Sequence, residues 1–410
     1  FVYCILYILY LFFFVRFPIL NPGFSSQKNP APGPQHPAPI THNFIPLPAE
    51  SKNKSYNIMD KPKILITGGS GFLGSHIVKE LSGPDTLLQP SLIRVLDIKD
   101  FRGEEKVDFV KADIRDYEAV MKACEGMDAV IHCAAIVDWG THSASEVYDV
   151  NVGGTENVLK ACCDLGITSM LYTSSLDALY SGKPLRNIND DQPYPRRFHN
   201  MYCQSKVFAE MRVKEACDGK LRTAILRPSD IYGPADPYHM NALIGMAKTG
   251  FFVRLGNGRA LGQHVYAGNM AHAHVLAMKA LLEGNEKVIG QAYLITDGPS
   301  SNFFKFFDQI VVRAGYRYWP RNLWIPRAPA YIMGSVSEFI ALLVRPFRRY
   351  NPGLSRFAVN YTSTDFTFNS DRAREHFGFV PKYTEEEAIA LTAEYYRKGK
   401  KVLGIENSEI

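Results

Sequence analysis

A glycine-rich turn between an apolar strand and an apolar helix constrains this chain more than any other feature of its sequence. Residues 63–74 read K-I-L-I-T-G-G-S-G-F-L-G. The run at 63–67 predicts a short buried strand, and apolar residues return with roughly helical spacing after the glycines. Strand, glycine turn and helix are the context of a dinucleotide-binding fingerprint. The alternative is an ordinary glycine turn without a ligand.

Each part of this turn has a predicted role. Gly68 permits the tight turn, Gly71 lets the backbone approach a pyrophosphate, and Gly74 lets the helix lie close to the sheet. The phosphates would meet free N–H groups at the positive end of the helix. Phe72 and Leu73, which open that helix, complete the predicted cofactor-binding set of this segment.

An acidic residue follows at the distance that the fingerprint requires. Asp97 ends a second apolar run, L-I-R-V-L-D, and lies 23 residues after Gly74. A carboxylate there can accept both ribose hydroxyls of NAD and would repel the 2′-phosphate of NADP, a preference that Lys99 would soften. The sequence therefore predicts NAD as the cofactor. The alternative for Asp97 is a strand-end residue that caps a turn.

A second motif, Y-C-Q-S-K at 202–206, can move a proton. Tyr202 and Lys206 are four residues apart in a helix-compatible stretch, 200–217, so both side chains share one face. A free phenol has a pKa of about 10, too high for a base at neutral pH. A neighbouring ammonium and a positively charged nicotinamide would favour the phenolate. The pair therefore predicts acid–base chemistry beside a redox cofactor, and a solvated helix face is the alternative.

Two serines end another strand-like run, S-M-L-Y-T-S-S at 169–175. The C-terminal ends of strands in an open parallel sheet face the cofactor crevice, so a hydroxyl on Ser174 or Ser175 can hydrogen-bond the reacting oxygen. The alternative is that both serines only cap the turn.

Together these segments resemble the extended short-chain dehydrogenase/reductase superfamily, and within it the 3β-hydroxysteroid dehydrogenase/isomerase family. The resemblance runs from about residue 61 to 401. The superfamily motifs are the glycine turn, A-D-I-R-D at 112–116, H-C-A-A at 132–135, N-V-G-G-T at 151–155, Y-T-S-S at 172–175, Y-C-Q-S-K and R-P-S-D-I-Y-G-P at 227–234. The family-level signals are H-V-Y-A-G-N-M-A-H-A-H at 264–274, the apolar segment near 323–344 and F-T-F-N-S-D-R-A-R-E-H-F-G-F at 366–379.

The resemblance implies roles for individual residues. Tyr202 would be the acid/base, Lys206 its partner, and Ser175, the second serine of the pair, the catalytic serine. Asp113 would contact the adenine, and Asn151 would anchor a water or a backbone link near the site. The remaining cofactor contacts implied are Ile114, Ala134, Ala135, Lys206, Pro228 and Ser229. Tyr266 is a candidate for the substrate pocket, with a buried aromatic residue in a strand as the alternative.

Alternating strand and helix patterns predict the architecture. Strand-like runs occur at 63–67, 92–97, 107–111, 129–133, 169–173 and 221–227, with helical patterns between them. This alternation predicts an α/β fold with a Rossmann-type, doubly wound parallel sheet. Beyond about residue 228 the alternation weakens and aromatic residues and prolines become more frequent. We therefore expect an NAD-binding domain at 61–230 and mainly a smaller C-terminal substrate-binding lobe at 231–401.

Composition excludes several classes of protein. The chain is 46% hydrophobic, which is enough for a sizeable core, and its formal net charge of +5 is modest for 410 residues. No basic stripe with interleaved aromatic residues predicts nucleic-acid binding, and no cysteine spacing predicts a zinc site. The seven cysteines are predicted to be reduced thiols that face a cytosol-like compartment. His272 and His274 lack an evident third ligand and are interpreted as structural or pocket-lining.

The two apolar segments outside the Rossmann pattern raise the question of a membrane. Residues 1–20 are almost entirely apolar, which predicts a membrane anchor, and 21–60 predict a disordered, proline-rich linker. The alternative is that 1–58 are upstream translated sequence, since the chain begins with Phe1 and its first methionine is Met59. The second segment, 323–344, is followed by arginines at 345, 348 and 349 and is a candidate membrane-associating surface, or else a buried helix of the lobe.

The predicted activity is the NAD-dependent oxidation of a 3β-hydroxyl group on a steroid or sterol. A Δ5–Δ4 isomerisation could follow, but the sequence does not assign its acid/base. The alternatives are a decarboxylating sterol-4-carboxylate 3-dehydrogenase, a sugar-nucleotide epimerase, an NADPH-dependent ketone reductase and a non-catalytic NAD(H)-binding regulator. We expect a homodimer at the cytoplasmic side of an intracellular membrane of the endoplasmic-reticulum type, or in the cytoplasm.

Overall fold

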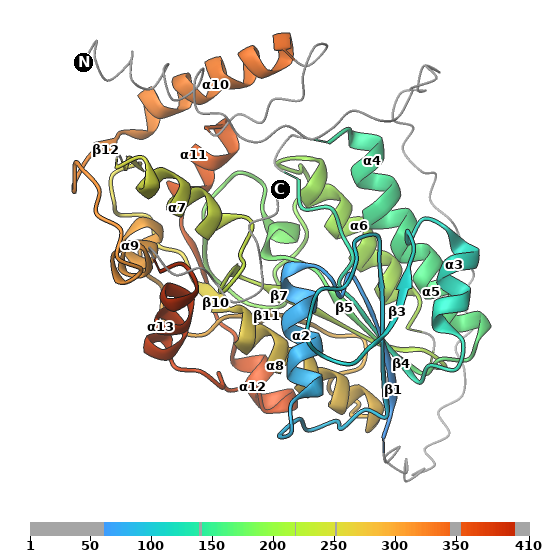
Figure 1. The fold of residues 1–410 in the computed structure, drawn as a ribbon. Coiled ribbons are helices and arrows are strands. Elements are labelled where there is room, and N and C mark those ends of the chain that lie inside the picture. The colour runs from blue at the N-terminus through green and yellow to red at the C-terminus, as the bar shows by residue number, and fades with distance from the viewer. Residues whose placement is uncertain (1–60, 139–141, 218, 251, 345–353, 398–410) are drawn as a thin grey trace. The chain divides into compact units, whose positions relative to one another are not determined.

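A parallel sheet of seven strands forms the centre of the computed structural model (Figure 1). The structure describes residues 61–397 except 139–141, 218, 251 and 345–353, so the predicted segments 1–20 and 21–60 lie outside the described residues. In chain order the strands of the sheet are β1 (Lys63–Thr67), β2 (Leu92–Asp97), β3 (Asp108–Lys111), β4 (Ala129–His132), β5 (Ser169–Thr173), β7 (Arg222–Pro228) and β11 (Ala292–Ile295).

The strand order is β11-β7-β5-β4-β1-β2-β3. From β1 the chain moves outward through β2 and β3, and then crosses to the other side of β1 to form β4. The winding direction therefore reverses between β1 and β4, and in open parallel sheets ligands bind in the crevice at the carboxyl ends of the strands at such a switch point. The predicted doubly wound, Rossmann-type fold is confirmed.

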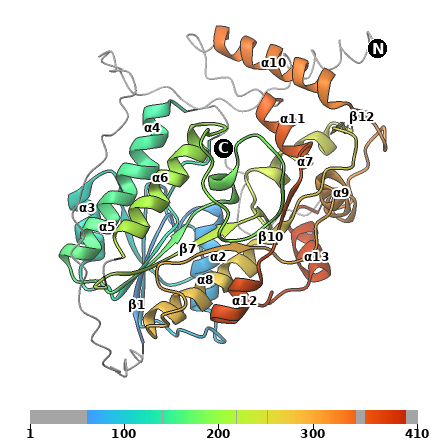
Figure 2. The same cartoon turned by 180° about the vertical axis from the view of Figure 1, so that it is seen from behind.

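Helices cover both faces of the sheet (Figures 1 and 2). One face carries α2 (Phe72–Ser82) and α8 (Ala267–Leu282), and the other carries α3 (Tyr117–Cys124), α5 (Gly154–Asp164) and α6 (Met201–Glu215). Ile64 and Ile66 of β1 belong to the core on the α2 side, whereas Leu65 between them belongs to the core on the α5 side. Successive strand residues point to opposite faces, so a strand covered on both faces is apolar throughout.

The sequence pattern placed six of the seven strands within one or two residues of their observed bounds. It missed β11, which pairs with β7 through contacts such as Ile295 beside Pro228. The helix α8 also lies beyond residue 230, and it packs on β4, β5 and β7. The chain thus returns to complete the sheet after residue 230, and the division into an NAD-binding domain at 61–230 and mainly a substrate-binding lobe at 231–401 stays a prediction.

The other elements join segments that are far apart in the sequence. Three short parallel strand pairs, β8 with β10, β9 with β12 and β6 with β13, make these connections. The elements are α4 (Ala144–Tyr148), the π-helix η1 (Asp149–Gly153), the 3₁₀-helix η2 (Leu176–Leu179), β6 (Leu185–Ile188), β8 (Asp230–Tyr232), α7 (His239–Lys248), β9 (Arg254–Leu255), β10 (His264–Tyr266), α9 (Phe303–Arg313), β12 (Trp324–Ile325), α10 (Arg327–Val344), α11 (Arg356–Thr362), β13 (Phe366–Phe368), α12 (Asp371–Phe377) and α13 (Glu385–Tyr395).

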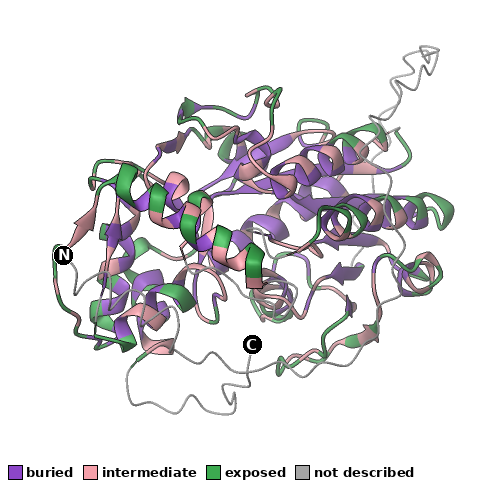
Figure 3. Ribbon diagram, turned by 90° about the horizontal axis from the view of Figure 1, so that it is seen from above, coloured by how far each residue is buried: buried purple, intermediate pink, exposed green. Residues whose placement is uncertain are grey.

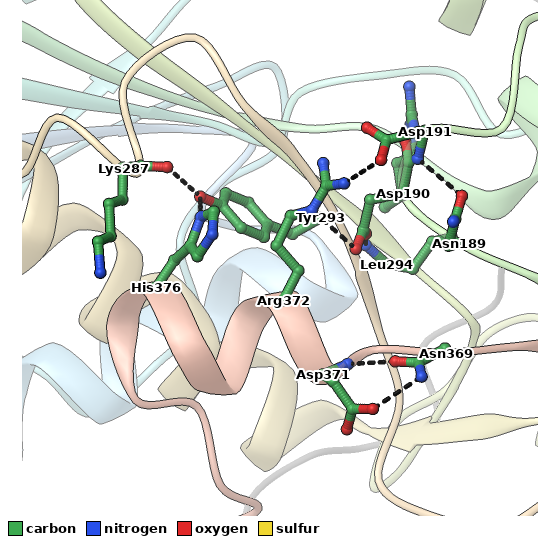
Figure 4. A network of polar contacts seen from close by, with 11 residues as sticks. Asn189, Asp190, Asp191, Lys287, Tyr293, Leu294, Asn369, Asp371, Arg372 and His376 are labelled. Atoms are coloured by element: carbon green, nitrogen blue, oxygen red, sulfur yellow. Dashed lines mark hydrogen bonds and ion pairs between the residues drawn. The ribbon is translucent and has the colours of Figure 1, made fainter.

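A network of hydrogen bonds and an ion pair connects α12 to the edge strand β11 (Figure 4). Arg372 Nε of α12 lies 3.6 Å from Asp190 Oδ2, and the other oxygen of Asp190 accepts the backbone N–H of Leu294 at 2.5 Å. The hydroxyl of Tyr293 and Nδ1 of His376 are 2.9 Å apart. An open sheet edge is a template for pairing with other chains, and α12 with its network covers this one.

The helix α10 differs from the other helices because most of its apolar side chains are exposed. Its buried positions, Ala330, Gly334 and Ser337, form one stripe, and Gly334 approaches the backbone of Ser355 closely. The exposed side chains are Tyr331, Ile332, Val336, Phe339, Leu342 and Leu343. Figure 3 shows the exposed face along this helix. Within the described residues, α10 is the one helix long and apolar enough to cross a membrane, and 17% of it is buried.

Candidate active site

The glycine turn lies at the switch point of the sheet and is closely packed. Gly68 has a φ of +74°, and a Cβ there would lie 2.7 Å from the backbone nitrogen of Ala134, which follows β4. A Cβ on Gly74 would collide with the carbonyl oxygen of Gly68. Only glycine fits these two positions, because the backbone of β4 and the first turn of α2 both reach the loop. The sequence assigned these glycines the same tight turn and close packing.

The start of α2 fits a dinucleotide phosphate. Gly71 is the N-cap of α2, and a Cβ there would lie 3.1 Å from the carbonyl oxygen of Gly68. Phe72 and Leu73 form the first turn. The hydroxyl of Ser70 is buried and has no hydrogen-bond partner among the described residues. A helix N-terminus with free N–H groups and a neighbouring buried hydroxyl is a suitable environment for an anion. The residues present therefore fit the pyrophosphate of NAD.

Asp97 lies beside this loop at the end of β2. Its Oδ2 accepts the backbone N–H of Ser70 at 3.0 Å, and its Oδ1 accepts that of Lys99 at 2.9 Å. Asp97 thus does cap a turn, as its alternative reading states. Each carboxylate oxygen retains a further lone pair, so the same group can also accept ribose hydroxyls. The Lys99 backbone, rather than its ammonium, makes the contact with Asp97.

The residues predicted to contact the adenine follow β3, and the predicted contacts Ala134 and Ala135 follow β4. Asp113 forms an ion pair with Arg115 at 2.6 Å, and this guanidinium holds the pKa of the Asp113 carboxyl below its usual value. Ile114 is buried against the position of Gly154 at the start of α5. Ala134 and Ala135 form the segment that leaves β4 next to the glycine turn.

Asn151 links the strand-exit segment to the helix that carries Tyr202 and Lys206. Its Oδ1 accepts the N–H of Ile136 at 2.7 Å, and its Nδ2 donates to the carbonyl of Ile136 at 2.9 Å and to Ser205 Oγ at 3.0 Å. Both N–H groups of the Asn151 amide are thereby used, and the side chain makes a backbone link. It lies in the π-helix η1, a local widening that often occurs at functional sites.

The helix α6 carries both members of the predicted proton-transfer pair. Asn200 caps its N-terminus by accepting the N–H of Cys203 at 2.8 Å. Tyr202 and Lys206 lie on its buried side and are 5% and 3% exposed, so the alternative of a solvated helix face is wrong. Lys206 Nζ donates to the carbonyl oxygen of Thr173 at 3.0 Å and to the hydroxyl of Tyr172 at 3.3 Å.

The electrostatics of this pair differ from the expectation. Burial raises the pKa of Tyr202 well above 10, and the negative charge of Asp177 raises it further. Burial also lowers the pKa of Lys206 to about 8. The sequence reasoning expected the lysine ammonium to lower the pKa of the phenol. In the structure the ammonium is held by the end of β5, and desolvation dominates at both groups.

The two serines at the end of β5 have different partners. Ser174 Oγ donates to the buried carboxylate of Glu210 at 2.5 Å, which in turn pairs with Arg227 at 2.6 Å. Ser175 caps η2, and its hydroxyl lies close enough to the Tyr202 phenol to lower the pKa of that phenol, against the effect of burial. The structure therefore brings Ser175 to Tyr202 and assigns Ser174 to a structural network.

The remaining predicted residues fall into two groups. Pro228 ends β7, and Ser229 follows it with a buried hydroxyl that has no hydrogen-bond partner among the described residues. Both lie at the carboxyl ends of the strands. Tyr266 instead ends β10, and its ring packs against His76 of α2 and against Tyr383. Burial raises the pKa of Tyr266 to about 12, as expected for an aromatic residue within a packed cluster.

Asp177 is the residue beside the predicted pair that sequence reasoning missed. Ser175 Oγ donates to Asp177 Oδ2 at 3.0 Å and accepts the backbone N–H of Asp177 at 3.1 Å. A signal was present, because an acid two residues after a strand-end serine can form such a turn. That signal does not show that Tyr202, 25 residues later in the chain, faces the same carboxylate.

The two histidines singled out in the sequence have ordinary partners. Nε2 of His274 lies 2.8 Å from the hydroxyl of Thr173. Nδ1 of His272 lies 3.1 Å from Glu80 on α2. Among the residues that the structure describes, no cluster of histidine, cysteine or acidic side chains could hold a metal ion.

Fold and site together define a Rossmann-type oxidoreductase of the short-chain dehydrogenase/reductase superfamily. Residues 65–323 match the sequence profile of the 3-beta hydroxysteroid dehydrogenase/isomerase family. The chain belongs to this family. The prediction of an NAD-dependent oxidoreductase that acts on CH–OH groups is thus confirmed at the level of the family.

Three curated relatives illustrate the range of the family. Short-chain dehydrogenase/reductase family 42E member 1 of Danio rerio is 32% identical, over 82% of this chain and 89% of the relative. The 3 beta-hydroxysteroid dehydrogenase type 7 of Homo sapiens is 31% identical, over 80% and 94%. The decarboxylating sterol-4-alpha-carboxylate 3-dehydrogenase of Mus musculus is 28% identical, over 84% and 94%.

Solved structures share the fold at lower identity. The dTDP-glucose 4,6-dehydratase DesIV of Streptomyces venezuelae, with NAD and TYD bound, has a TM-score of 0.64 at 21% identity, over 82% of this chain and 97% of that one. UDP-glucose 4-epimerase of Thermotoga maritima has a TM-score of 0.62 at 22% identity, over 82% and 99%. These enzymes support the architecture.

Proposed function

We propose that this protein oxidises the 3β-hydroxyl group of a sterol or steroid, with NAD as the hydride acceptor. The observation that carries the proposal is the meeting of Ser175 and Tyr202 at the carboxyl end of the sheet, with Lys206 one helical turn further along α6. This group lies on the same edge of the sheet as the glycine turn, where the switch point places a dinucleotide.

Each residue of the candidate site would have a separate role in alcohol oxidation. Tyr202 removes the proton of the substrate hydroxyl, and Ser175 holds the oxygen by a hydrogen bond. Lys206, anchored by the carbonyl of Thr173, supplies positive charge near the phenol and an N–H for the cofactor ribose. Ser229, whose buried hydroxyl after β7 has no partner in the described part of the chain, would lie beside the nicotinamide.

The cofactor would be held by the glycine turn and the strand ends. Gly68, Gly71 and Gly74 would admit the pyrophosphate at the start of α2, and Asp97 would accept the ribose hydroxyls. Asp113 and Ile114 would border the adenine. When bound, NAD supplies the hydride-accepting carbon, and the protein contributes alignment and acid–base groups.

The names of the relatives support a sterol-like substrate. Two are named sterol-4-alpha-carboxylate 3-dehydrogenases, and three are named 3β-hydroxysteroid dehydrogenases, two of them also decarboxylases. A 4-carboxysterol whose oxidation is followed by loss of CO₂ is therefore the second candidate reaction. Isomerisation of a Δ5 double bond stays a prediction, because it needs a second proton-transfer group at the substrate.

The exposed face of α10 supports a membrane surface as a partner. Large apolar residues such as Ile332 and Phe339 are 65% and 59% exposed, and arginines follow in the sequence at 345, 348 and 349. An apolar helical face beside basic residues suits an anionic membrane surface. A water-insoluble substrate would then enter from the bilayer, at the cytoplasmic face of an internal membrane.

The predicted homodimer would be checked by sedimentation equilibrium.

The test of the activity is NADH production in detergent, with NAD and a substrate panel. The panel contains a Δ5-3β-hydroxysteroid, a saturated 3β-hydroxysteroid, a 4-carboxysterol and a sugar nucleotide. We expect turnover of a sterol or steroid that falls about 100-fold or more in Tyr202→Phe, the scale of general acid–base catalysis. Tyr148→Phe, an exposed tyrosine on α4, is the matched control and should keep full activity. Turnover of the sugar nucleotide only would contradict the proposal.

A further inference from the structure

Asp177 forms two hydrogen bonds with the hydroxyl of Ser175. The 3₁₀-helix η2 begins directly after Ser175 and places Asp177 two residues further on. The Ser175 hydroxyl donates to the carboxylate at 3.0 Å and accepts the Asp177 N–H at 3.1 Å. These two bonds fix the position of the Ser175 oxygen, which lies close to the Tyr202 phenol.

The carboxylate of Asp177 is buried beside other charged groups. Its Oδ1 has no hydrogen-bond partner among the residues that the structure describes. Asp230 of β8 faces it with a like charge, whereas His239 of α7 and Lys206 of α6 oppose that charge. Burial and Asp230 raise the pKa of Asp177 to about 6, so the group is mostly ionised at neutral pH. A buried carboxylate with one unpartnered oxygen is costly for the fold, which calls for a reason beyond capping η2.

We propose that Asp177 is a positioning residue that sets the pH at which Tyr202 gives up its proton. It does so by fixing the position of the Ser175 hydroxyl and by placing a negative charge near the Tyr202 phenol. This inference rests on the proposed function, in which Tyr202 takes the substrate proton.

The sign of the effect follows from the charges. An ionised Asp177 opposes the formation of a second negative charge on Tyr202, and the Tyr202 pKa is raised in part by this carboxylate. Neutralising Asp177 therefore favours the phenolate and the oxidation of an alcohol at lower pH. With Asp177 ionised, Tyr202 remains a proton donor over a wider pH range, which favours reduction of a ketone.

Other titratable and charged groups also interact electrostatically with Asp177. They are the residue that ends η2 and residues of α6, β8, α7 and α11. The titratable and charged groups that interact with Asp177 are Tyr180, Tyr202, Cys203, Lys206, Asp230, His239 and Tyr361. Tyr361 donates a hydrogen bond to Asp230 at 2.6 Å, so the charge of Asp230 is partly engaged elsewhere. Asp177 is thus the carboxylate that bears directly on Ser175.

The first test measures the ionisation of Tyr202 without any substrate. The full chain is labelled with ¹³C at the tyrosine ring carbon that bears the hydroxyl, saturated with NAD, and titrated by NMR. The signal of Tyr202 is the one that Tyr202→Phe removes. In Asp177→Asn, whose amide oxygen can still accept the Ser175 proton, we expect the Tyr202 pKa to fall by about one unit or more. Asp191→Asn, an exposed carboxylate on a different segment, should leave it unchanged.

The second test follows the pH profile of NADH formation in the same variants. The acidic limb of kcat for alcohol oxidation should move to lower pH in Asp177→Asn by the amount seen by NMR. Asp177→Ser is a second neutral variant in case the first does not fold. An unchanged Tyr202 titration in a folded neutral variant would reduce Asp177 to a helix cap and overturn the inference. A shifted titration without turnover of any sterol would instead contradict the proposed function and leave the coupling between Asp177 and Tyr202 established.

Discussion

The geometry of the candidate site depends on a few hydrogen bonds that individual side chains donate. The ammonium of Lys206 donates to Thr173 and Tyr172, and the hydroxyl of Ser175 donates to Asp177. These bonds fix the side chains around Tyr202 while leaving its phenol buried with a raised pKa. Buried groups with shifted pKa values in a crevice are typical of catalytic sites, because the shift adapts them to proton transfer.

The buried lysine makes a prediction about stability and pH. Lys206 has a pKa of about 8 in the folded protein and 10.5 as its ordinary value. Between these pH values the unfolded chain binds more protons, so this group makes the free energy of unfolding rise with pH, by at most about 1.4 kcal/mol per pH unit. Urea unfolding at pH 8 and pH 9.5 should show this rise in the native protein relative to Lys206→Met. An identical pH dependence in both proteins would count against a buried, charged lysine.

The glycine turn makes a prediction about packing. Gly74→Ala would force a methyl group into the carbonyl oxygen of Gly68, which should destabilise the fold by about 1–3 kcal/mol and abolish NAD binding. Gly245→Ala is the matched control, because a Cβ there has open space within α7 and should stabilise the helix by about 0.5–1 kcal/mol. Urea unfolding and titration calorimetry with NAD measure both effects. Native-like NAD binding by Gly74→Ala would show that the turn does not hold the cofactor.

At the scale of elements, the sequence patterns that predict well are those made by neighbours in the chain. The strand, glycine turn and helix at the start of the fold were predictable because their residues are contiguous. The strand β11 was not, since its four residues, A-Y-L-I, are too short to show a period. The position of Tyr266 among His76 and Tyr383 was also beyond reach, because these contacts join segments up to 190 residues apart in the sequence.

The helix α10 makes a prediction about membrane binding. Ile332→Ser combined with Phe339→Ser should lower the fraction that floats with vesicles of phosphatidylcholine and phosphatidylserine at least tenfold. Burying each of these side chains contributes roughly 1.5–3 kcal/mol. Val312→Ser combined with Val380→Ser is the matched control, because both valines are exposed away from α10, on α9 and between α12 and α13. If the control pair weakens flotation equally, or the native chain does not float, α10 is not the attachment surface.

For the molecule as a whole, both halves of the Rossmann sheet contribute residues to the side where the strands have their carboxyl ends. The first strand supplies the glycine turn, and β5, α6 and β7 supply the serine, the tyrosine–lysine pair and Ser229. A buried ion pair between Glu210 of α6 and Arg227 of β7 holds these elements in register, with Ser174 bonded to the same carboxylate. The chain after residue 230 also returns to the sheet, since β11 pairs with β7 and α12 packs against β11.

The most direct test of the central claim is to follow the hydrogen itself. A 3β-hydroxysterol carrying deuterium on the carbinol carbon is incubated with the protein and NAD, and the reduced cofactor is analysed by mass spectrometry. Hydride transfer from that carbon predicts deuterium in the NADH formed, and no label in a parallel reaction with Tyr202→Phe. NADH that forms without deuterium would contradict the account, because the hydride would then come from another position.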